Sequence, residues 1–79
     1  MIIPTKYENI KENPLIIGSH VIALLKENPL SFLEIHHQLF QFKKIELGYE
    51  ILLETLTFLY LSEIIEIDNN IISLKNDSQ

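Results

Sequence analysis

The chain has 79 residues, enough for one domain with one core, and 47% of them are hydrophobic. A domain of this size has too little interior to bury all of these side chains. We therefore expect either an exposed apolar patch that binds a partner protein or a homo-oligomer. The net charge of −5, with six lysines and no arginine, argues against direct binding to nucleic acid, which depends on cationic side chains.

Targeting and redox features are few. There are no cysteines, so no disulfide is expected. The first residues lack the basic region and long apolar stretch of a signal peptide. No uncharged run reaches the ~20 residues that span a membrane; the apolar run at residues 55–62, for example, is far shorter. We therefore expect a cytoplasmic protein with no membrane segment.

The first helix is predicted to begin at Pro14, with Asn13 as its N-cap, and to end near residues 27–29 because Pro29 disfavours helical geometry before it. Gly18 costs about 1 kcal/mol against alanine inside a helix. It therefore predicts a close approach by another element. The expected core positions follow a helical period: Ile17, Val21, Leu24 and Leu25.

The second helix has the strongest start signal. Ser31 and Glu34 have the spacing of a capping box, and Leu30 and Ile35 have that of a hydrophobic staple. The helix is expected to fade over residues 41–44. Its predicted buried residues are Phe32, Leu33, Ile35, Leu39 and Phe40.

A third helix is predicted over residues 48–62, with Gly48 as N-cap. Its broad apolar face contains Tyr49, Leu52, Leu53, Leu56, Leu59 and Tyr60. Its expected exposed residues are Glu50, Glu54, Thr55, Thr57 and Glu63.

After the third helix the pattern changes to β-branched runs at residues 64–67 and 71–74. They flank Asp68, Asn69 and Asn70, and asparagine tolerates the positive φ of a tight turn, so a β-hairpin is predicted. A short strand at residues 2–3 is a candidate addition to it, and residues 76–79 are expected to fray. We predict a single domain over residues 1–79, mainly α with a β-hairpin, as in a winged helix-turn-helix. An α+β mini-domain of another topology predicts the same elements.

No catalytic set is recognised. His36 and His37 are adjacent on a helix and point about 100° apart, so only one of them could share a metal site with His20. Glu50 and Glu54 lie one turn apart, as expected of a solvated helix face. Two glycines in all cannot form a phosphate-binding loop. We therefore predict no enzymatic activity, no metal and no cofactor.

The third helix of a winged helix is the one that usually enters the major groove of DNA. Here it carries glutamates and no cation, and the hairpin tip contains Asp68. Lys43 and Lys44 form the only adjacent basic pair. The surface that usually reads DNA is therefore expected to serve another purpose.

Short motifs recur in a distinctive order: residues 4–6 (Pro-Thr-Lys), Leu15, Gly18, Ile22, residues 29–31 (Pro-Leu-Ser), residues 49–50 (Tyr-Glu), residues 59–60 (Leu-Tyr) and residues 65–66 (Ile-Glu). In this order they resemble the small middle component, of the sixth type, of bacterial ABC-three-component systems. The resemblance covers about residues 1–75. Members of that family typically have histidine where this chain has Tyr7, often glycine where it has Glu63, and serine where it has Gly48.

The resemblance implies an adaptor or regulatory subunit that bridges an SMC-like ABC ATPase and an effector, such as a nuclease, in a system of the anti-phage defence type. The residues predicted to contact these partners are Pro4, Thr5, Lys6, Tyr7, Tyr49, Glu50 and Glu54. Two other hypotheses stay open at this point. One is a homodimeric winged-helix transcriptional regulator that uses Lys43 and Lys44 on phosphates, and the other is an antitoxin-like partner that masks a basic toxin.

Overall fold

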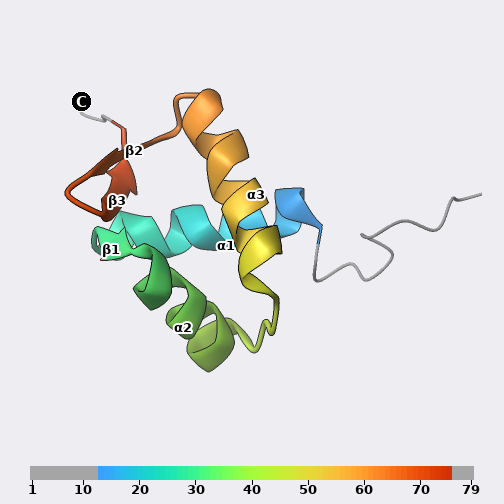
Figure 1. Ribbon diagram of the computed structural model, residues 1–79. Helices are drawn as coiled ribbons and strands as arrows, with labels where there is room; N and C mark the ends of the chain where they lie inside the picture. Colours follow the sequence, from blue (N-terminus) through green and yellow to red (C-terminus); the bar gives the residue numbers. More distant parts are fainter. Residues whose placement is uncertain (1–12, 76–79) are drawn as a thin grey trace, which may run out of the picture.

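The computed structural model describes residues 13–75, which form three helices and a small antiparallel sheet (Figure 1). Along the chain, the elements are α1 (Pro14–Glu27), β1 (Leu30–Ser31), α2 (Phe32–Lys43), α3 (Tyr49–Leu61), β2 (Ile65–Asp68) and β3 (Ile71–Leu74). The predicted strand at residues 2–3 and the predicted frayed tail at residues 76–79 lie outside the described residues. No helix of residues 13–75 is long and apolar enough to cross a membrane.

The sheet has the strand order β1-β3-β2, and both pairings are antiparallel. Ile72 of β3 lies at its centre, opposite Leu30 on one side and Ile67 on the other. Strand β1, which the sequence did not predict, joins the hairpin to the segment between α1 and α2. Three helices with such a sheet are compatible with a winged helix-turn-helix, and the predicted fold class is confirmed.

Side-chain caps fix where the first two helices begin. The Leu15 amide donates to Asn13 Oδ1 at 2.8 Å, which satisfies one of the free amides at the start of α1. At α2 the capping box is complete: the Glu34 amide donates to Ser31 Oγ at 3.2 Å, and the Ser31 amide donates to Glu34 Oε1 at 2.9 Å. Both predicted helix starts are confirmed.

Residues with left-handed backbone conformation make the last two turns within residues 13–75. Glu63 has φ 63° just after α3, where its amide donates to the Tyr60 carbonyl and the Ile64 amide donates to the Leu59 carbonyl. These are the two hydrogen bonds of a Schellman motif. In the hairpin, Asn69 and Asn70 have φ 53° and 67°, as a two-residue type I′ turn requires.

The core lies where α1 crosses α3 and meets the inner face of the sheet (Figure 1). A β-carbon built on Gly18 lies 3.7 Å from Leu59 Cδ2 and 3.8 Å from Thr55 Cγ2, so α3 passes close to α1 at this glycine, as predicted. The buried hydrophobic residues are Ile17, Val21, Leu25, Leu30, Ile35, Leu39, Ile45, Leu47, Leu52, Leu56, Leu59, Ile65 and Ile72.

Some expectations about burial are wrong. Thr55 was expected on the exposed face, but it is fully buried against α1, and its hydroxyl donates to the Ile51 carbonyl at 2.9 Å. Leu33 and Phe40 were expected in the core and are exposed, because the buried face of α2 is narrow. The α2–α3 connection supplies Ile45 and Leu47 in their place.

Candidate protein-binding groove

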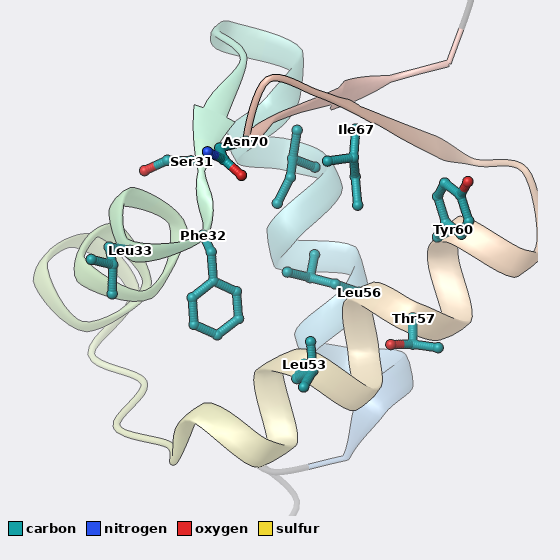
Figure 2. Close-up of a pocket in the computed structure, with 10 residues that line it drawn as sticks. Ser31, Phe32, Leu33, Leu53, Leu56, Thr57, Tyr60, Ile67 and Asn70 are labelled. Atoms are coloured by element: carbon teal, nitrogen blue, oxygen red, sulfur yellow. The ribbon is translucent and has the colours of Figure 1, made fainter.

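An apolar groove opens between the start of α2, one face of α3 and the hairpin (Figure 2). Its volume is about 430 Å³. We call it the α3–hairpin groove, and its lining residues are Ser31, Phe32, Leu33, Leu53, Leu56, Thr57, Tyr60, Ile67, Asn70 and Ile72.

The floor of the groove is part of the core, whereas its walls are exposed. Leu56 and Ile72 are buried. In contrast, Leu53, Tyr60 and Ile67 have 58%, 51% and 50% of their surface exposed. When a partner covers apolar walls that are half exposed to water, the free energy falls by about 25 cal/mol per Å² of apolar surface buried. Binding of a partner in the groove is therefore favourable.

Each wall is held by a local feature of the sequence. Residues 53, 56, 57 and 60 recur at helical spacing, so they form one face of α3. The capping box sets the first turn of α2, from which Phe32 points toward α3 (Figure 2). The type I′ turn and the pairing of Ile67 with Ile72 place Ile67 and Asn70 over the opposite side.

The charges of the elements around the groove are mostly negative. From Tyr49 to Lys75, the part of the chain that forms α3 and the hairpin, the acids are Glu50, Glu54, Glu63, Glu66 and Asp68, and Lys75 is the one cation. Lys75 Nζ lies 3.9 Å from Glu63 Oε1 in a solvent-exposed pair. With five acids and one lysine, this part of the chain carries a net charge of −4.

The groove lining itself is poor in reactive groups. Its polar members are the hydroxyls of Ser31, Thr57 and Tyr60 and the amide of Asn70. Over residues 13–75, no three histidine, cysteine, aspartate or glutamate side chains gather in a way that could hold a metal ion. The arrangement favours recognition of an apolar surface over chemistry on a substrate.

Of the residues predicted from sequence as contacts, those that the structure describes do not line this groove. Pro4, Thr5, Lys6 and Tyr7 fall outside the described residues. Tyr49, Glu50 and Glu54 are exposed on α3 but do not line the groove. Their predicted role as partner contacts stays a prediction.

Tyr49 also has a structural environment of its own. Its ring centroid lies 4.6 Å from that of His36 and 5.7 Å from that of Phe32. His36 Nε2 in turn is hydrogen-bonded to the Leu47 carbonyl at 2.8 Å. This cluster fixes the connection between α2 and α3, and through Phe32 it supports the wall of the groove.

Sequence reasoning missed the groove because its lining comes from three separated segments. The apolar face of α3 was recognised, but Leu53 and Tyr60 were assigned to it together with the core residues. The surplus of apolar residues in the sequence predicts an exposed apolar patch, but it does not indicate which elements form the patch.

Comparison with known proteins identifies one family. A family model described as ABC-three component (ABC-3C) system Middle Component 6 matches residues 3–74. Neither the curated proteins nor the solved structures contain a significant match.

Proposed function

Because the chain belongs to the Middle Component 6 family of ABC-three-component systems, we propose that it is a non-catalytic adaptor that binds the two other components of its system. Membership of the family implies that the chain works with other components of such a system. We propose further that these components are an SMC-like ABC ATPase and an effector, that the chain acts in the cytoplasm, and that the system serves anti-phage defence.

The observation that carries the proposal is the α3–hairpin groove. Its exposed walls, Leu53, Tyr60 and Ile67, surround a floor that belongs to the core. Protein interfaces of this kind combine a well-packed apolar centre with a polar rim, and a few aromatic or aliphatic anchors carry most of the binding energy. The groove offers a pocket for such anchors.

Charge favours a protein partner over DNA. In a DNA-binding winged helix, α3 and the hairpin face the phosphates, and binding depends on lysine and arginine there. In this chain α3 contains Glu50 and Glu54 and no cation, and the hairpin contains Glu66 and Asp68. Because this surface would repel phosphates, its charge argues against the hypothesis of a DNA-binding transcriptional regulator.

Co-expression with the genes that flank its own tests the proposal. The tagged chain is expected to retain an ABC ATPase and a second, effector-like protein through size-exclusion chromatography, each identified by mass spectrometry. A chain that elutes alone in the presence of both proteins would refute the adaptor role. A mobility-shift assay on duplex DNA at low salt, where electrostatic binding is strongest, is expected to show no complex.

A further inference from the structure

We propose that the α3–hairpin groove binds an amphipathic helix of a partner protein, whose apolar residues enter the groove and whose lysine or arginine residues contact the acidic elements around it. This inference rests on the proposed adaptor function and adds the chemistry of the segment that is recognised.

The shape of the groove suits a row of side chains. Its volume is about 430 Å³, and its lining comes from the start of α2, from α3 and from the hairpin, so the groove is bounded on three sides. Leu53, Leu56 and Tyr60 follow one another along α3, and Phe32 and Ile67 face them from the two other sides (Figure 2). A helix laid in such a groove inserts residues at positions i, i+3 or i+4, and i+7.

Charge complementarity selects the partner. The elements that bound the groove carry Glu50, Glu54, Glu66 and Asp68 outside its lining; Glu66 lines a neighbouring hollow that shares Tyr60 and Ile67 with the groove, and Asp68 follows Ile67 in the chain. A second copy of this chain, with its net charge of −5, brings like charge toward like charge. A basic segment is instead attracted to these acids as it approaches, and it avoids the repulsion between like charges.

A helix fits the groove better than an added strand does. Among the described strands, β2 lies at one edge of the sheet, but its Glu66 and Asp68 are charged and exposed, which discourages strand pairing. The apolar side chains gather on the side that faces α3 (Figure 2). A partner therefore buries most apolar surface when its side chains enter between α3 and the hairpin.

Synthetic peptides of about two heptads test the proposal on the full chain. The first contains leucine at helical spacing with lysine elsewhere, the second has the same composition in strict alternation, and the third replaces every lysine of the first with glutamate. In NMR titrations we expect the first peptide to bind and to shift the amides of the groove residues. The other two are expected to bind at least tenfold more weakly.

Matched variants locate the binding. Leu53→Ala removes an exposed leucine of the groove, and Leu15→Ala removes an exposed leucine of α1 away from it; the two residues are 58% and 71% exposed. Leu53→Ala is expected to weaken binding of the first peptide at least fivefold, and Leu15→Ala to leave it unchanged. Asp68→Lys is expected to weaken binding of the first, lysine-containing peptide and to reduce the salt dependence of that binding. It is expected to strengthen binding of the third, glutamate-containing peptide. Circular dichroism checks that each variant is folded.

Several results would overturn the inference: no binding of the first peptide, equal losses in Leu53→Ala and Leu15→Ala, or preferred binding of the alternating peptide with shifts confined to β2. Self-association that Leu53→Ala abolishes would assign the groove to a second copy. Duplex DNA that shifts the groove amides would assign the groove to nucleic acid.

Unchanged co-purification of both system components with Leu53→Ala would refute the role of the groove while leaving the adaptor role intact. Peptide binding in the groove without any co-purification would refute the adaptor role alone.

Discussion

Replacing Glu63 with glycine is expected to stabilise the protein, because the backbone there is held in a conformation that disfavours other residues. Glu63 has φ 63° in the Schellman motif that ends α3. For a residue with a β-carbon this conformation costs about 1–2 kcal/mol, and glycine adopts it freely. The family resemblance also implies that glycine is often found at this position.

Two smaller effects oppose the gain. Glycine has more freedom in the unfolded chain, which costs about 0.5–1 kcal/mol. The substitution also removes the pair between Glu63 and Lys75, but with N···O at 3.9 Å and the Glu63 side chain 78% exposed, water screens most of its contribution. The net increase in the free energy of unfolding is expected to be about 0.5–1 kcal/mol. In a domain of this size it corresponds to a rise in Tm of about 2–8 °C.

Thermal and urea unfolding, followed by circular dichroism, measure this difference. Glu63→Ala removes the same carboxylate and keeps the strained backbone, so it is expected to give no gain. Lys75→Ala removes the ion pair from its other side and is expected to change the stability little. A Tm for Glu63→Gly that does not exceed that of Glu63→Ala would refute the reasoning.

Substitutions at three further positions are expected to change the free energy of unfolding, measured by urea denaturation. Gly18→Ala should stabilise by up to about 1 kcal/mol, because its methyl group meets α3 at ordinary contact distance; Gly18→Leu, which overpacks the same crossing, should cost about 1–3 kcal/mol. Asn70→Gly should add a few tenths of a kcal/mol, because asparagine-glycine is the preferred type I′ pair, and a loss would contradict the assigned turn. Leu52→Ala, at a fully buried residue, should cost about 2–5 kcal/mol, whereas Leu53→Ala, one residue further along α3, should change stability by less than about 0.5 kcal/mol.

The elements that the sequence predicts best are those with a local chemical signal. Asn13 and Ser31 cap the helices that they were predicted to cap, and the Asn69-Asn70 turn joins the predicted strands. Each of these signals depends on residues within four positions of one another, so tertiary structure is not needed to interpret it.

The elements that the sequence does not predict depend on distant partners. Strand β1 has only two residues, and it exists because Leu30 and Ser31 pair with Ile72 and Ile71, about forty residues away. Thr55 is buried because α1 crosses α3 at Gly18, which no pattern within α3 reveals.

The binding groove was hidden for the same reason. On α3, apolar residues face in several directions, so helical periodicity does not separate Leu52 of the core from Leu53 of the groove. Only the packing of α1 and the sheet decides which side is covered. The sequence supplied the surplus of apolar residues, and the fold determines where it is exposed.

Hydrogen–deuterium exchange of the chain, free and co-purified with the two other components of its system, tests the central claim most directly. We expect slower exchange on binding in α3 and in the hairpin, over residues 53–60 and 65–72, and unchanged exchange in α1. Protection confined to α1 and absent from these two segments would contradict the assignment of the α3–hairpin groove as the partner-binding surface.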